Sequence, residues 1–139
     1  MSDHHYFKFT NAVVIAPLIS ILTIWTVFWL ELRLQTNFND YGIYPGTFKG
    51  LRGILFSAFI HGSVEHLYNN TIPLAILMVG LFYFYRDNAM KVLVLGILAS
   101  GLITWAIGRP SYHIGASGVI YVLVSFIFFK GLITKYYRL

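Results

Sequence analysis

One serine stands at the head of an apolar run between small residues, where it is well placed to act as a nucleophile. The segment Gly115 to Gly118 follows a polar stretch and precedes the apolar residues 119–132. At the start of a membrane helix, unpaired backbone N–H groups and the helix dipole stabilise negative charge that develops near Ser117. A serine also needs a base to accept its proton, so the chemistry depends on partners elsewhere in the chain.

A second polar group lies at the start of another apolar run. His66 and Asn70 are four residues apart, so on a helix they share a face one turn apart. Ser63 is a suitable N-cap for that helix, and Glu65 falls in its first turn, where the dipole favours an acid. Asn69 points to a different face and is expected to be a packing or interface residue. Polar side chains at membrane depth by default indicate function or interhelical hydrogen bonding.

Each group has a structural alternative when it is considered alone. Small residues such as those around Ser117 allow membrane helices to pack closely, and His66 with Asn70 can hold helices together through hydrogen bonds. The two groups together are more specific, because a nucleophile with converging hydrogen-bond donors is what acyl transfer requires.

The composition makes the lipid bilayer the expected solvent of this chain. Of its 139 residues, 58% are hydrophobic and 11% are charged, whereas soluble domains carry roughly 25% charged residues. The net charge of +5 does not indicate nucleic acid, because Lys and Arg stand singly at the edges of apolar runs, as membrane topology signals do. The absence of cysteine excludes a disulfide framework, a thiolate nucleophile and a cysteine-based metal site.

Four apolar runs are long enough to cross a membrane, which takes about 20 residues. They predict membrane helices over residues 12–32, 67–85, 90–107 and 115–132, and therefore an all-α polytopic membrane protein with one domain over residues 1–139. A tight link at residues 86–88 makes the second and third helices an antiparallel hairpin. The long connection 31–63 contains a short apolar segment, 53–60, which is predicted to lie in the interface or to re-enter the membrane against protein.

The basic residues favour a cytoplasmic N-terminus, with six of them inside and four outside. The inside set is Lys8, Arg86, Lys91, Lys130, Lys135 and Arg138, and the outside set is Arg33, Lys49, Arg52 and Arg109. In this orientation the second and fourth helices both begin on the outer side, so His66 and Ser117 can approach each other. The first apolar run is too long for the core of a cleavable signal peptide and is predicted to be a retained helix.

On these residues the sequence resembles the rhomboid family of intramembrane serine proteases. His61, His66 and Asn70 reproduce the family's His-x4-His-x3-Asn pattern, and the segment that begins at Gly115 matches its Gly-x-Ser-Gly. Tyr121, one turn after the serine, matches the tyrosine that stacks on the family's catalytic histidine. The long first connection also resembles the family's first loop, which is partly embedded in the membrane.

The resemblance implies a rhomboid-like helix bundle that hydrolyses peptide bonds in or near transmembrane segments of membrane proteins. Ser117 is the implied nucleophile, and its backbone N–H forms the oxyanion hole with the side chains of His66 and Asn70. Three further residues complete the implied oxyanion and substrate-binding site: Gly115, Tyr121 and His61. His61 is also expected to hydrogen-bond within the first loop. The implied partners are transmembrane substrates and the lipid bilayer of a bacterial inner membrane; no cofactor, metal or nucleic acid is implied.

The sequence departs from the family pattern in ways that bear on activity. The rhomboid core has six transmembrane helices with the general-base histidine on the sixth, whereas this chain supplies four and has no histidine after His113. We therefore expect the N-terminal portion of a rhomboid protease, inactive by itself for lack of the base. His113 and His66 are the resident alternatives for that base. Arg52 resembles the arginine of the family's Trp-Arg pair only in part, because Leu51 stands in place of the tryptophan and the spacing differs by one residue.

Two other functions stay open on the sequence alone. One is a catalytically silent rhomboid-like protein that binds transmembrane segments. The other is an unrelated small polytopic membrane protein.

Overall fold

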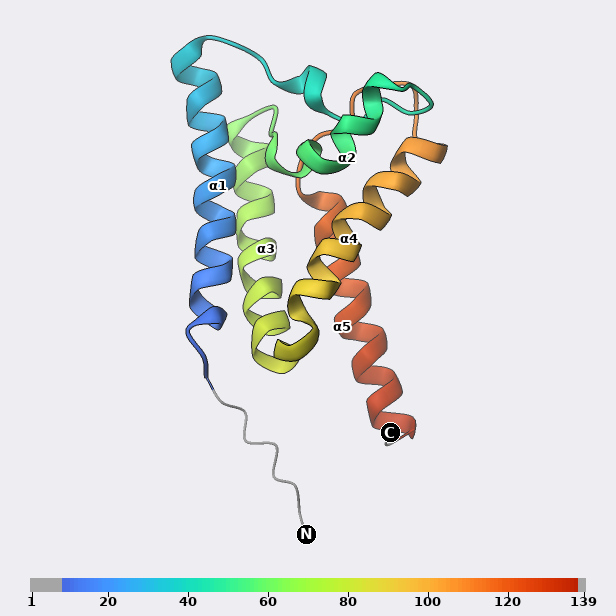
Figure 1. Cartoon of the computed structure of the whole chain (residues 1–139). Helices are drawn as coiled ribbons and strands as arrows, with labels where there is room; N and C mark the ends of the chain where they lie inside the picture. The colour runs from blue at the N-terminus through green and yellow to red at the C-terminus, as the bar shows by residue number, and fades with distance from the viewer. Residues whose placement is uncertain (1–8, 138–139) are drawn as a thin grey trace.

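The structure is a computed structural model that describes residues 9–137 (Figure 1), so the sides predicted for Lys8 and Arg138 lie outside the described residues. Four long helices are apolar enough to cross a membrane. They are α1 (Ala12–Leu34), α3 (Val64–Phe84), α4 (Arg86–Ile107) and α5 (Ser117–Tyr137). The predicted all-α polytopic bundle is confirmed, and the described residues contain no β-strand beyond one isolated bridge.

The helix boundaries differ from the predicted ones where polar residues belong to a helix. Helix α3 begins three residues early, because Ser63 Oγ accepts a hydrogen bond from the His66 N–H at 3.1 Å and caps the helix. The predicted link at residues 86–88 is wrong: Tyr85 alone separates α3 from α4. Asp87 lies in the first turn of α4, where the helix dipole favours an acid. The hairpin of α3 and α4 is therefore tighter than predicted.

The connection between α1 and α3 forms short helical pieces that pack on the bundle. These are η1 (Asn39–Tyr41), η2 (Lys49–Arg52), α2 (Gly53–Phe56) and η3 (Ser57–Phe59). A Cβ atom on Gly101 of α4 would lie 2.9 Å from Ile54 Cγ2, so α2 packs directly on α4. The segment 53–60 therefore packs against protein, whereas its predicted place in the interface or the membrane stays a prediction.

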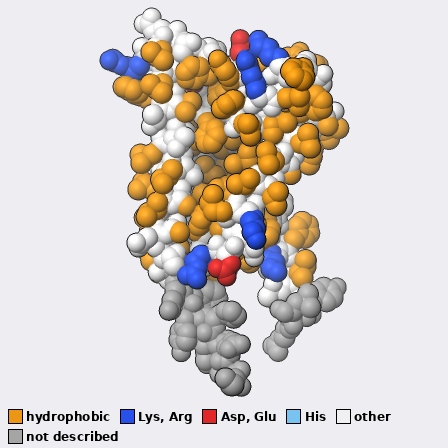
Figure 2. Space-filling model, viewed as in Figure 1, with side chains coloured by type: hydrophobic (Ala, Val, Ile, Leu, Met, Phe, Trp, Pro, Cys, Tyr) orange, Lys and Arg blue, Asp and Glu red, His pale blue; other side chains and the backbone are white. Residues whose placement is uncertain are grey.

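The core lies where α1, α3 and the first turns of α5 meet. Its fully buried side chains include Leu67, Met78 and Leu81 of α3 and Leu123 of α5. Many apolar side chains on the outward faces are exposed, and in Figure 2 they cover the middle of the molecule while Lys and Arg gather toward its ends. This distribution suits a protein whose lateral surface contacts lipid.

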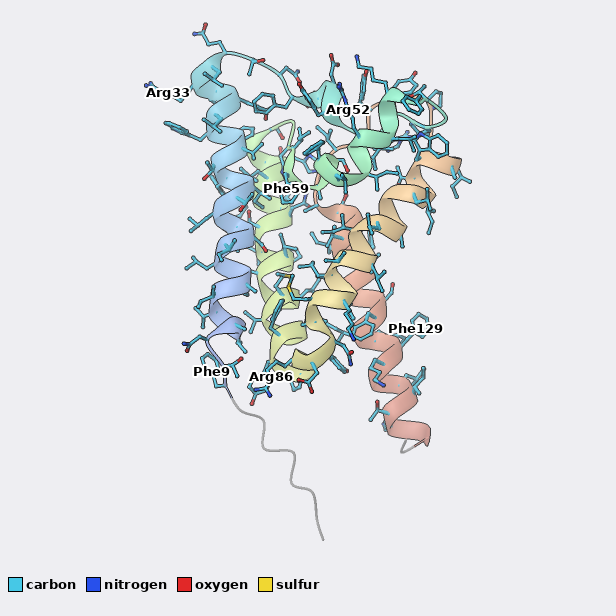
Figure 3. The ribbon with its side chains drawn as sticks, in the orientation of Figure 1. Phe9, Arg33, Arg52, Phe59, Arg86 and Phe129 are labelled. Atoms are coloured by element: carbon cyan, nitrogen blue, oxygen red, sulfur yellow. The ribbon has the colours of Figure 1, made fainter. Side chains whose placement is uncertain are left out.

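The two ends of the bundle carry different connections. Helix α1 begins and α5 ends at one end, where α3 turns into α4 (Figure 1). The first connection and the α4–α5 connection lie at the other end, with Arg33 and Arg52 there and Arg86 opposite (Figure 3). Helices α3 and α5 therefore begin at the same end of the bundle, as predicted. That this end faces the outer side of the membrane stays a prediction.

Candidate active site

The segment that leads into α5 is fixed by the first connection. The Ile43 N–H donates to the His113 carbonyl at 3.0 Å, and the His113 N–H donates to the Ile43 carbonyl at 2.8 Å. The Gly115 N–H donates to the Ser57 carbonyl at 2.8 Å. These backbone hydrogen bonds position residues 113–115 and thus the start of α5 at Ser117.

Gly115 lies directly against the polar pair of α3. Its φ of +102° favours glycine, and a Cβ atom there would lie 2.6 Å from His66 Nε2 and 3.3 Å from Asn70 Nδ2. No other residue type fits this position without moving the neighbouring side chains. The structure thus brings His66 and Asn70 together with the segment that carries Ser117.

His61 contacts the same segment from the first connection. The Ala116 N–H donates to His61 Nε2 at 3.4 Å, so His61 bonds to the α4–α5 segment in addition to its predicted interaction within the first loop, where the Phe59 carbonyl acts on the imidazole. The rings of His61 and His66 meet edge to face at 5.0 Å. Burial and, to a smaller extent, His66 lower the pKa of His61 to about 4, against the opposing effect of the Phe59 backbone carbonyl. His61 is therefore neutral at pH 7.

Asn70 presents a hydrogen-bond donor that has no partner. The side chain is buried, with 6% of its surface exposed, and Nδ2 makes no hydrogen bond within the described residues. A buried donor left unpaired costs about 1–3 kcal/mol. Nδ2 lies beside the backbone of Gly115, two residues before Ser117 in the chain.

Ser117 is the first residue of α5 and lines a cavity of about 190 Å³. Polar residues that share this lining are Ser57, Ser100, Thr104, His113 and Tyr121. His66 and Asn70 are absent from the lining, and they meet the serine segment at Gly115. In the first turn of α5 the Ile120 N–H donates to the Ala116 carbonyl at 3.0 Å, whereas the N–H groups of residues 117–119 have no acceptor within the helix and add to the donors near the serine.

Neither of the two histidines proposed as a base, His113 and His66, makes a hydrogen bond to Ser117 among the described residues. His113 shares the cavity with Ser117, but its Nε2 lies 3.0 Å from the Arg109 carbonyl oxygen. His66 packs on Gly115 and His61. Within residues 9–137, the hydrogen bonds of histidine rings go to Arg109 and Ala116, and none goes to Ser117 Oγ.

Two further predicted residues lie at the edge of this arrangement. Tyr121 lines the Ser117 cavity, and 72% of its surface is exposed. Arg52 Nη2 donates to the Asp40 carbonyl at 3.0 Å, and its guanidinium carbon lies 4.3 Å from the centre of the Tyr41 ring. Arg52 thus holds two parts of the first connection together through these contacts. In the part of the chain that the structure describes, no cluster of three His, Cys, Asp or Glu residues is arranged to hold a metal ion.

Sequence reasoning missed Ile43 and Ser57, which hold the serine segment through their backbones. Every residue type carries these backbone groups, so no side-chain pattern identifies them. The clustering of small residues and glycines around the first connection is the only sequence signal that two backbones approach there.

Comparison with known proteins identifies the family. The model of the Rhomboid domain matches residues 49–138, well over half of the chain. The chain belongs to the rhomboid family. With four helices that can cross a membrane, this rhomboid chain is an integral multi-pass membrane protein, and the alternative of an unrelated small membrane protein is wrong.

The similar curated proteins are mycobacterial. Uncharacterized protein Rv1337 of Mycobacterium tuberculosis and Uncharacterized protein Mb1372 of Mycobacterium bovis are each 37% identical over 114 residues, which cover 74% of this chain and 44% of each relative. Uncharacterized protein ML1171 of Mycobacterium leprae is 36% identical over 96 residues, 61% of this chain and 36% of that protein. The rhomboid chain thus spans less than half the length of these relatives. No solved structure matches it.

Proposed function

We propose that this rhomboid chain carries the nucleophile and the oxyanion hole of an intramembrane serine protease. The supporting observation is the contact of Gly115 with both His66 and Asn70, which joins the serine segment to two side chains that can donate hydrogen bonds. The unpaired Nδ2 of Asn70 gives one of these donors a chemical purpose, because an oxyanion would complete its hydrogen bonding.

In the proposed reaction, Ser117 Oγ attacks the carbonyl carbon of a peptide bond while a base accepts the serine proton. The carbonyl oxygen becomes an oxyanion held by the Ser117 N–H, His66 and Asn70. Collapse of this intermediate breaks the C–N bond, and the proton passes from the base to the leaving amine. Water then hydrolyses the acyl-enzyme ester through the same base. We place that base on a histidine of a later helix, as the family resemblance implies.

The substrate class follows from the position of the site. Ser117 lies at the end of a membrane-spanning helix, beside a cavity lined by polar side chains that can hold water. The proposed substrate is a transmembrane segment with small or helix-breaking residues near the cleavage point, because an intact helix hides its carbonyl groups. We propose that this end of the bundle faces outward and that the N-terminus is cytoplasmic in a bacterial inner membrane.

The test uses the polypeptide encoded by the complete gene, reconstituted in liposomes with a fluorescent transmembrane substrate and a fluorophosphonate label. We expect cleavage and labelling to be lost in Ser117→Ala and retained in Ser125→Ala, a matched control two turns further along α5. Asn70→Ala should lower the cleavage rate by about 10²–10³. Labelling that persists in Ser117→Ala would refute the assignment of the nucleophile.

The catalytically silent alternative gives a different result in the same experiment. A silent rhomboid-like protein would bind the transmembrane substrate without cleaving it, and Ser117→Ala would leave binding unchanged. The comparison of binding with turnover therefore decides between the two functions.

A further inference from the structure

A second polar cavity lies between the end of α1, the first connection and His61. Its volume is about 180 Å³, and it shares no residue with the cavity of Ser117. Its polar lining consists of Glu31, Thr36, Asn37, Asn39 and His61. A cavity of this size and polarity holds several water molecules. The proposed function uses none of its residues except His61.

Glu31 contributes a buried carboxylate to this cavity. Only 8% of the residue is exposed, and Oε1 accepts a hydrogen bond from the Phe38 N–H at 2.7 Å. Among the described residues no lysine or arginine pairs with it. A carboxylate has two oxygens and about four lone-pair sites, so Glu31 retains capacity to accept further hydrogen bonds.

His61 contributes a buried donor to the same cavity. The residue is 1% exposed, and Nδ1 has no hydrogen-bond partner within the described residues. Because Nε2 accepts from the Ala116 N–H and the imidazole is neutral, the proton resides on Nδ1. The Phe59 carbonyl also acts on the imidazole, but it does not complete a hydrogen bond with Nδ1. His61, with its orphan donor, and Glu31, with its carboxylate, thus line one cavity.

We propose that Glu31 is a positioning residue that accepts, through water in this cavity, a hydrogen bond from His61 Nδ1–H. This link fixes the tautomer in which His61 Nε2 is free to accept from the Ala116 N–H. A carboxylate that orients a histidine by bonding to its other ring nitrogen is a recurrent device in proteins, and a bridging water replaces a direct bond at little cost. Glu31 at the end of α1 thereby holds the residue that precedes Ser117.

The effect on catalysis rests on the proposed function, but the tautomer itself does not. The decisive measurement is therefore the ¹⁵N NMR spectrum of the histidine rings in the chain labelled with ¹⁵N-histidine and held in detergent micelles, with the His61 signals identified by their loss in His61→Gln. We expect the Nδ1–H tautomer in the unmodified chain. Glu31→Gln keeps an oxygen for the Phe38 N–H but loses the second acceptor, so the other tautomer should become populated.

Glu65→Gln is the matched control, because it makes the same chemical change at an exposed acid in the first turn of α3. It should leave the His61 signals unchanged. An unchanged His61 spectrum in Glu31→Gln, with helical content and melting temperature preserved, would overturn the proposal and leave the Phe59 carbonyl as the group that fixes the tautomer.

A second measurement separates this inference from the proposed function. In the polypeptide from the complete gene, Glu31→Gln should slow fluorophosphonate labelling at least tenfold, whereas Glu65→Gln should not. A tautomer change without slower labelling would overturn the positioning role. Labelling that also survives in Ser117→Ala would instead refute the proposed nucleophile, and the NMR result would still stand.

Discussion

Replacement of Gly115 by alanine tests whether the serine segment and the polar pair of α3 form one packed site. The new methyl group would lie 2.6 Å from His66 Nε2 and 2.7 Å from His66 Cε1, on a backbone with φ of +102°. Two separate penalties follow. The backbone conformation disfavours any residue with a Cβ atom, and the imidazole must move to make room for the methyl group.

The magnitude is estimated from these two penalties. A residue other than glycine in a sparsely populated backbone region costs about 1–3 kcal/mol. Overpacking of a well-packed site costs about 1–3 kcal/mol more. Gly115→Ala should therefore lower the free energy of unfolding by about 2–6 kcal/mol, which corresponds to a melting temperature lower by at least roughly 6 °C for a chain of this size.

Gly46→Ala is the matched control for the backbone penalty. Gly46 also has a positive φ, +72°, but a Cβ atom there would meet nothing within 4 Å. Gly131→Ala, at an equally open position inside α5, controls for the added methyl group and should be neutral or slightly stabilising. Thermal unfolding in detergent, followed by circular dichroism, ranks the three variants. Equal destabilisation by Gly115→Ala and Gly46→Ala would show that His66 does not pack on Gly115, and the reasoning about the site would be wrong.

Two further predictions concern buried polar groups. Burial lowers the pKa of His61 from 6.5 to about 4, so between these two pH values the unfolded chain binds a proton that the folded chain does not. The free energy of unfolding should therefore be unaffected by this group above pH 6.5 and should fall by up to about 3 kcal/mol as the pH is lowered to about 4. Melting temperatures from pH 7 to pH 4 should fall less steeply in His61→Gln, and equal slopes would contradict this. Asn70→Leu removes an unpaired buried donor and should raise the free energy of unfolding by about 1–3 kcal/mol while it abolishes cleavage by the complete protein; a lower melting temperature would show that Nδ2 has a structural partner.

The sequence predicted the four helices correctly but misplaced their ends, and the reason is physical. An apolar window detects the residues that lipid can contact, whereas hydrogen bonding determines where a helix begins. Helix α3 starts at Val64 because Ser63 caps it, although the next two residues are polar. Arg86 and Asp87 look like a loop by polarity, yet they form the first turn of α4.

The parts of the candidate site that depend on the type of side chain could be predicted from the sequence, and the parts that depend on backbone groups could not. The spacing of His61, His66 and Asn70 and the small residues around Ser117 were visible in the sequence, and the structure places these two groups in contact through Gly115. The carbonyl of Ser57, which fixes Gly115, was invisible because every residue has one. The buried carboxylate of Glu31 was equally hidden, since a glutamate at the end of an apolar run is ordinarily solvated.

The two polar regions at this end of the bundle each contain one unpaired hydrogen-bond donor, and the two donors are expected to behave differently. Among residues 9–137, Asn70 Nδ2 has no partner and lies against Gly115 of the serine segment, and Nδ1 of His61, which lines the cavity with Glu31, has none either. If both donors served only packing, apolar side chains of similar size would be more favourable at both positions. On the two proposals, water in the Glu31 cavity satisfies His61 in the resting protein, whereas a substrate oxyanion satisfies Asn70 only during the reaction. Asn70→Leu should therefore raise the free energy of unfolding of the resting protein, whereas Glu31→Gln should not. The sign of the stability change thus tests which of the two donors serves catalysis.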